Sequence, residues 1–323
     1  MAQGCHLIYS HSDREHFPLN TSIERPTVDE VASQFKTKYN LNWNRILPSQ
    51  DLIKNEPSGI KIDENRAEGI YKVLHGTLQT FNQRFEALKP MQQSIISGLL
   101  TTRTDQQSDI ITGLGNPELN HDMARNIPDA LDRLLKHDKN CSGLFNKVRK
   151  GESTWISNLK NTGTGKANGI AYEVLASAKM IHSPIKGRPI SIYDHLDFGP
   201  KLQASYGGGG DIKVSDGEKE SIFSQPHRTT VEADLLITQP PPPLGGGKEI
   251  AVDFKHSASK ANVTEQQMEG VAVALKTGEV DEWHFVCNKN FNGTVHKNIQ
   301  EINAELKADN KPTIKLHENY DWR

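Results

Sequence analysis

The chain has 323 residues, of which 35 % are hydrophobic and 24 % charged, and its formal net charge at pH 7 is -2. This length and balance are typical of a soluble chain with two globular domains, and they exclude a sequence that is disordered throughout. The slight negative charge excludes a bulk attraction to polyanions, so any contact with nucleic acid needs a local basic surface.

Targeting and redox signals are also weak. No stretch approaches the roughly 18 apolar residues of a membrane span, and the first residues lack the basic and apolar regions of an export signal. Cys5, Cys141 and Cys287 lie far apart without a CxxC pair, which predicts neither a disulfide framework nor a cysteine zinc site. We therefore expect a cytoplasmic chain without membrane contact.

Residues 1–150 are expected to form a mainly helical domain without a chemical motif. Apolar residues at helical spacing predict helices at Val28–Tyr39, Glu64–Leu88, Met91–Leu100 and Pro128–Leu135, with a short one at Cys141–Val148. We place the domain boundary near Gly151. Delivery, dimerisation and target recognition are the candidate roles of this first domain.

After Gly151 the pattern changes to an alternation of helix and strand. The run KANGIAYEVLASAKM at Lys166–Met180 predicts an amphipathic helix with Glu173 in its middle. The runs TTVEADLLIT at Thr229–Thr238 and KEIAVDFK at Lys248–Lys255 have the β-branched and apolar content of strands. Four prolines and three glycines between them predict a long loop that joins two hairpin-paired strands.

A helix at Thr264–Lys276 and a third strand at Glu282–Cys287 complete the predicted order. The order α-β-β-α-β defines an α/β core with a mixed sheet.

Acidic residues fall on the predicted strands in a pattern that suggests chemistry. Side chains alternate along a strand, so Glu232 and Asp234 share one face, as do Asp253 and Lys255. If the two strands pair, these side chains meet on one patch. Packed acids repel one another and resist burial, and a divalent metal with hard oxygen ligands, Mg²⁺ or Mn²⁺, relieves that cost.

The ordered set Glu173, Asp234 and Asp253-Phe254-Lys255 resembles the E…D…(D/E)XK signature of the PD-(D/E)XK, restriction-endonuclease-like nucleases. It is also similar to nuclease domains of bacterial polymorphic and contact-delivered toxins, in which a helix like GIAYEVLASAKM precedes the catalytic strands. The resemblance covers about residues 165–290. The position of the proline in the family's name holds Ala233.

The resemblance implies a Mg²⁺-dependent endonuclease with definite roles for these residues. Asp234, Asp253 and the carbonyl of Phe254 would ligate the metal, which activates the attacking water and neutralises charge on the phosphorane. Lys255 would orient that water or stabilise the transition state. Glu173 would complete the metal shell.

Two choices stay open at the level of residues. Glu232 competes with Glu173 as the additional metal ligand. A glutamine in the helix after DXK often accompanies the signature, and helical periodicity does not decide between Gln266 and Gln267.

The predicted function is cleavage of nucleic acid, with DNA favoured over RNA. The resemblance points to a bacterial toxin or effector, delivered into a target cell without a Sec signal and countered by an immunity protein. A restriction or repair endonuclease is the competing enzyme. A non-catalytic module that binds nucleic acid or protein on the same fold is the alternative outside enzymology.

Overall fold

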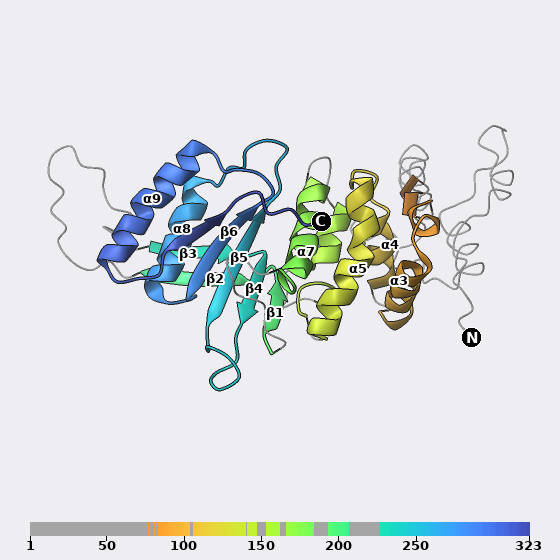
Figure 1. Ribbon diagram of the computed structural model, residues 1–323, viewed down its shortest axis with the longest axis horizontal. Coiled ribbons are helices and arrows are strands. Elements are labelled where there is room, and N and C mark those ends of the chain that lie inside the picture. The colour runs from red at the N-terminus through yellow and green to blue at the C-terminus, as the bar shows by residue number, and fades with distance from the viewer. Residues whose placement is uncertain are drawn as a thin grey trace, which may run out of the picture. The chain divides into compact units, whose positions relative to one another are not determined.

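The computed structural model describes residues 76–77, 80–81, 83–103, 106–139, 141–146, 153–161, 166–183, 193–206 and 227–323 (Figure 1). The chain divides into two compact units, one of residues 1–129 with 156–167 and one of residues 130–155 with 168–323. The expected helix at Val28–Tyr39 lies outside the described residues. The expected boundary near Gly151 remains a prediction.

The described part of the first unit is helical. It contains α3 (Pro90–Thr102), α4 (Gln107–Leu114), the first half of α5 (His121–His137) and most of α6 (Trp155–Asn161). Pro90 begins α3 because its fixed φ suits the first helical turn, where no backbone N–H is needed. The helix expected at Met91–Leu100 is therefore confirmed.

Helix α5 begins earlier than the sequence predicts. We expected it to start at Pro128, but it starts at His121 and contains Pro128. The reason is a cap: Asn120 Oδ1 accepts hydrogen bonds from the N–H groups of Asp122 and Met123, at 2.9 and 3.3 Å. This cap satisfies donors of the first turn and fixes the true start of the helix.

The second unit is built on a mixed five-stranded sheet in the order β1-β4-β5-β6-β7, beside a two-stranded sheet of β2 and β3. The strands are β1 (His195–Phe198), β2 (Lys201–Tyr206), β3 (His227–Glu232), β4 (Leu235–Thr238), β5 (Glu249–Lys255), β6 (Glu282–Cys287) and β7 (Ile314–His317). Strands β4 and β5 pair antiparallel, as expected, whereas β6 is parallel to both β5 and β7. The predicted mixed α/β class is confirmed.

Three helices cover this sheet. Helix α8 (Glu265–Thr277) connects β5 to β6, and α9 (Gly293–Ala308) connects β6 to β7. Both pack on the sheet face that carries Trp283 and Phe285, where they form the main core (Figure 1). Helix α7 (Lys166–Met180), with the predicted bounds, packs against the opposite face, where Tyr172 contacts Phe254.

The single strand expected at Thr229–Thr238 is wrong, because the chain bends at Ala233 and Asp234 and forms β3 and β4 instead. The bend lies opposite Gly199 and Pro200, which separate β1 from β2. Gly199 has φ +64°, and Pro200 has no N–H with which to continue a ladder. Two hydrogen bonds of 3.1 Å, Gly199 N to Asp234 O and Ala233 N to Pro200 O, carry the pairing across the bend.

The short helix expected at Cys141–Val148 is also wrong over the described residues 141–146. Ser142 instead bonds to the edge of β1, donating to Leu196 O at 3.2 Å and accepting from Phe198 N at 2.8 Å. Pairing with a distant strand overrides the local helical pattern here.

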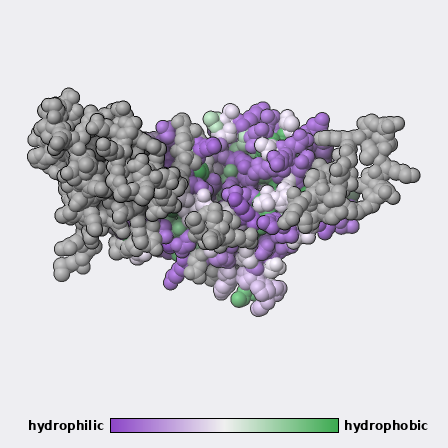
Figure 2. Space-filling model, turned by 180° about the vertical axis from the view of Figure 1, so that it is seen from behind, coloured by the Kyte–Doolittle hydropathy of each residue, from purple (hydrophilic) through white to green (hydrophobic). Residues whose placement is uncertain are grey.

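The described surface is mostly hydrophilic in the view of Figure 2. Over the described ranges, no helix is both long enough and apolar enough to cross a bilayer.

Candidate functional site

Five of the side chains singled out in the sequence lie together in the second unit. We call them the carboxylate cluster: Glu173 of α7, Asp234 at the bend before β4, Asp253 and Lys255 of β5, and Gln267 of α8. Four separate elements thus contribute to one site.

Asp253 is the centre of the cluster, and its side chain is 1 % exposed. Its Oδ1 atom forms an ion pair with Lys255 Nζ at 2.5 Å, while its Oδ2 atom accepts a hydrogen bond from Gln267 Nε2. Oδ1 is buried and makes no aligned hydrogen bond. Gln266 is exposed, so the structure brings Gln267 to the cluster and leaves Gln266 at the surface.

Asp234 reaches the cluster because of the bend in its strand. Its Oδ2 atom accepts a hydrogen bond of 2.6 Å from the backbone N–H of Phe254. The ladder between β4 and β5 ends at Leu235 and Val252, so this carboxylate takes a donor of β5 just beyond the last strand pair. The N–H of Phe254 is thereby paired, and the expected metal contact of its carbonyl remains a prediction.

The three acids strongly perturb one another. Burial, followed by the charges of Asp234 and Asp253, raises the pKa of Glu173 well above its usual range. Burial and the charge of Asp253 do the same to the pKa of Asp234, and the pKa of Asp253 is also raised by burial. Burial and mutual repulsion therefore favour the protonated forms of these acids when no cation is bound.

Lys255 is the cation that opposes this repulsion. Burial disfavours its charge, but Asp253 and Asp234 outweigh burial and raise the pKa of its ammonium. Lys255 is consequently a fixed positive charge beside the carboxylates.

Glu232 lies at the margin of the carboxylate cluster. Its charge contributes to the raised pKa of Glu173, but its own side chain is exposed, and it faces Lys201 across the pair of β3 and β2. Glu173 is the less exposed of the two, and both remain candidates for an additional ligand.

The carboxylate oxygens of the cluster are the ligands that a hard divalent cation prefers, but the side chains are not arranged in a metal coordination site. In the part of the chain that the structure describes, no three His, Cys, Asp or Glu side chains have the arrangement of a metal site. The fit rests on the donor set itself: three carboxylates that repel one another, Asp253 buried and Asp234 and Glu173 half-buried. A bound cation would take the place of the protons as the neutralising charge, next to Lys255.

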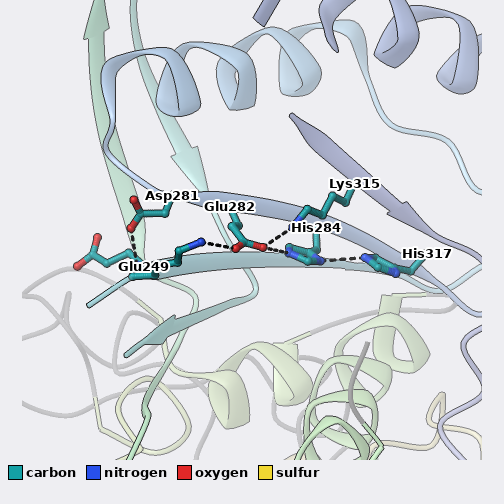
Figure 3. Close-up of polar contacts among 7 residues, drawn as sticks. Glu249, Asp281, Glu282, His284, Lys315 and His317 are labelled. Carbon is teal, nitrogen blue, oxygen red and sulfur yellow. Dashed lines mark hydrogen bonds and ion pairs between the residues drawn. The ribbon is translucent and has the colours of Figure 1, made fainter. Parts of the chain in front are cut away.

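A second polar cluster, which the sequence analysis did not identify, lies on the face of β6 opposite to Trp283 and Phe285 (Figure 3). We call it the Glu282 cluster. Glu282 pairs with Lys248 at 3.0 Å, with Lys315, and with His284 Nε2 at 3.3 Å. His284 Nδ1 and His317 Nε2 lie 2.8 Å apart in nearly parallel rings. Alternation along EWHFVC places Glu282 and His284 on one face, a signal that could have revealed half of this cluster.

No protein-family model matches the chain, and neither the curated proteins nor the solved structures contain a significant match to it. The function is therefore inferred from the chemistry of the site itself.

Proposed function

We propose that the chain is a nuclease that hydrolyses phosphodiester bonds with Mg²⁺ or Mn²⁺, and that DNA is its favoured substrate over RNA. The convergence of Asp234, Asp253 and Lys255 carries the proposal. Buried carboxylates that repel one another are costly for stability, and a module that only binds polyanions gains nothing from them. The order of elements supports a restriction-endonuclease-like core: α7 is followed by β4, by β5 antiparallel to it with Asp253 and Lys255, by α8, and by β6 parallel to β5.

Asp234 and Asp253 would hold the cation, with Glu173 or Glu232 as the additional acid. The cation, when bound, supplies positive charge to the scissile phosphate and acidity to a water molecule. One oxygen of each central carboxylate is already held by the protein, Asp234 Oδ2 by Phe254 N–H and Asp253 Oδ2 by Gln267. Both carboxylates are thus oriented before a ligand arrives.

Lys255 performs the remaining part of the chemistry. Its ammonium lies beside Asp253, and 25 % of the Lys255 side chain is exposed. A compact positive charge at this position can orient the attacking water and stabilise the charge that develops on the phosphate.

The biological setting is proposed from the resemblance alone. A toxin or effector delivered into a target cell fits it best, with an immunity protein as its partner. A restriction or repair nuclease would carry the same chemistry.

The decisive experiment measures cleavage of plasmid DNA and of structured RNA by the purified chain with Mg²⁺, Mn²⁺ or EDTA. The test variants are Asp253→Asn and Lys255→Met. The control variants make the same two changes away from the cluster: Asp309→Asn at the C-terminal end of α9 and Lys297→Met within α9. Circular dichroism checks that each variant is folded. We expect cleavage that requires the cation, falls at least a hundredfold in the first pair and stays within twofold in the second.

The same experiment separates the alternatives. A preference for one polymer identifies the substrate class. Absence of cleavage of either polymer with either cation would refute the nuclease and favour a non-catalytic binding module.

A further inference from the structure

The segment that follows β7, residues 318–323, connects two parts of the second unit, and we call it the clasp. The backbone N–H of Tyr320 donates to Cys287 O at the end of β6, at 2.9 Å. On the other side, the hydroxyl of Tyr172 in α7 donates to Tyr320 O at 2.7 Å. Lys179, also of α7, donates to Asp321 O at 2.5 Å. The clasp therefore ties helix α7 to the end of the sheet.

Tyr172 is also fixed from the side of β5. Its side chain is fully buried, at 0 % exposure. Its ring meets Phe254 edge-on at 6.0 Å between centroids and lies 5.6 Å from the ring of His256. Phe254 and His256 are the two neighbours of Lys255 in the chain. Tyr172 therefore packs against the end of β5, which carries Asp253 and Lys255.

Glu173 follows Tyr172 directly in α7. It is the one acid of the carboxylate cluster that comes from outside the sheet strands and the bend between them. Its distance to Asp234 and Asp253 therefore depends on how α7 sits against β5. A shift of about 1 Å in a supporting element is enough to spoil a preorganised site.

We infer that Tyr172 is a positioning residue, held by the clasp, that sets Glu173 at the right place for a divalent cation shared with Asp234 and Asp253. The inference rests on the proposed function. The Tyr172 hydroxyl donates to Tyr320 O and is not a ligand of the cation. Tyr172 therefore affects the cation only through the position of Glu173.

The test is a titration of the full chain with Mn²⁺, in which electron paramagnetic resonance measures the concentration of free Mn²⁺ and so gives the Kd. Tyr172→Phe keeps the ring and removes only the hydroxyl, and we expect it to raise the Kd for Mn²⁺ about tenfold, as loss of an outer-shell partner usually does. In a Glu173→Gln background the same change should have no further effect, because its route to the cation is already lost.

Tyr193→Phe is the matched control. It also removes a single tyrosine hydroxyl, from an exposed side chain ahead of β1 that belongs neither to the clasp nor to the carboxylate cluster. We expect its Kd to equal that of the wild type. Lys179→Met loosens the clasp at a half-exposed position, which keeps the inference testable if Tyr172→Phe does not fold. We expect Lys179→Met to raise the Kd for Mn²⁺ about threefold, and to have no further effect in a Glu173→Gln background.

Each remaining outcome is decisive. Unchanged Mn²⁺ binding in folded Tyr172→Phe, or losses that add in the double variant, would overturn the positioning role while leaving the nuclease intact. A wild-type chain that neither binds Mn²⁺ nor cleaves nucleic acid would overturn the proposed function, and this inference with it.

Discussion

Gln267 donates a hydrogen bond from its side-chain amide to Asp253, the buried carboxylate at the end of β5. The backbone of Gln267 is itself fixed, because its N–H donates to the side chain of the N-cap residue Thr264 at 3.2 Å. The cap of α8 therefore orients the amide, and the amide orients the carboxylate.

Gln267→Ala is expected to lower the rate of DNA cleavage and the affinity for Mn²⁺ by about 10- to 100-fold, because the Asp253 carboxylate loses the donor that orients it. Gln266→Ala removes an identical side chain from the exposed neighbouring position and should change both quantities less than twofold. Plasmid nicking rates measured over a series of Mn²⁺ concentrations test the pair. Equal effects of the two substitutions would contradict the role of Gln267.

Glu173 should make the cation-free chain less stable as the pH rises. Its pKa lies well above the usual 4.5 in the folded chain, because of burial and of Asp234 and Asp253. The folded chain therefore keeps a proton that the unfolded chain releases. This contribution to stability is full below about 4.5 and declines as the pH rises towards the folded pKa.

The measurement is urea unfolding in EDTA at several pH values above 4.5, the usual pKa of Glu173. Glu173→Gln should be more stable than the wild type near pH 7, and the difference should shrink towards the acid end of the series. Glu301→Gln, on the exposed side of α9, serves as the control. Parallel curves for wild type and Glu173→Gln would show that burial does not perturb this acid.

The chemistry of the DXK strand was predictable from sequence because it depends on local geometry. Alternation predicts that Asp253 and Lys255 share a face, and their 2.5 Å ion pair confirms it. The choice between Gln266 and Gln267 was not predictable. Neighbouring helix positions differ by about 100°, so the choice depends on how α8 packs against the sheet.

The bend that delivers Asp234 was beyond a local pattern for another reason. TTVEADLLIT has strand character throughout, and the interruption comes from Gly199 and Pro200, which lie between the partner strands β1 and β2 that the sequence pattern did not predict. Helix α9 and strand β7 were missed as well, so the sheet has more strands than the predicted core. Pairing between segments distant in the chain determined these features.

Glu282 should stabilise the folded chain with a pH dependence opposite to that of Glu173: its contribution to the free energy of unfolding falls as the pH is lowered. Burial alone would raise the pKa of Glu282, but hydrogen bonds from Lys315 and Lys248 outweigh it and lower the pKa from 4.5 to about 2. The resulting stabilisation is present above 4.5 and is lost as the pH falls towards 2. Glu282→Gln should therefore lower the free energy of unfolding at pH 7 by about 2 kcal/mol.

This substitution should also flatten the loss of stability in acid. Urea unfolding between pH 7 and pH 3 measures both effects, with Glu301→Gln again as the control. Because Glu282 lies on the sheet face opposite Asp253, Mn²⁺ binding should stay within twofold of the wild type at pH 7. A wild-type acid profile in Glu282→Gln would mean that the two lysines do not stabilise this carboxylate.

Gly169 and Gly270 lie within helices but have opposite surroundings. A Cβ added at Gly270 of α8 would come within 2.8 Å of Val231 Cγ2 in β3, whereas nothing lies within 4 Å of a Cβ added at Gly169 of α7. Gly270→Ala should destabilise the chain by about 1–3 kcal/mol, because the Val231 side chain or the strand that carries it must shift away from α8. Gly169→Ala should stabilise it by about 0.5–1 kcal/mol, because alanine loses less backbone entropy in a helix. Urea unfolding of both variants provides the measurement, and stabilisation by Gly270→Ala would show that α8 does not pack closely on β3.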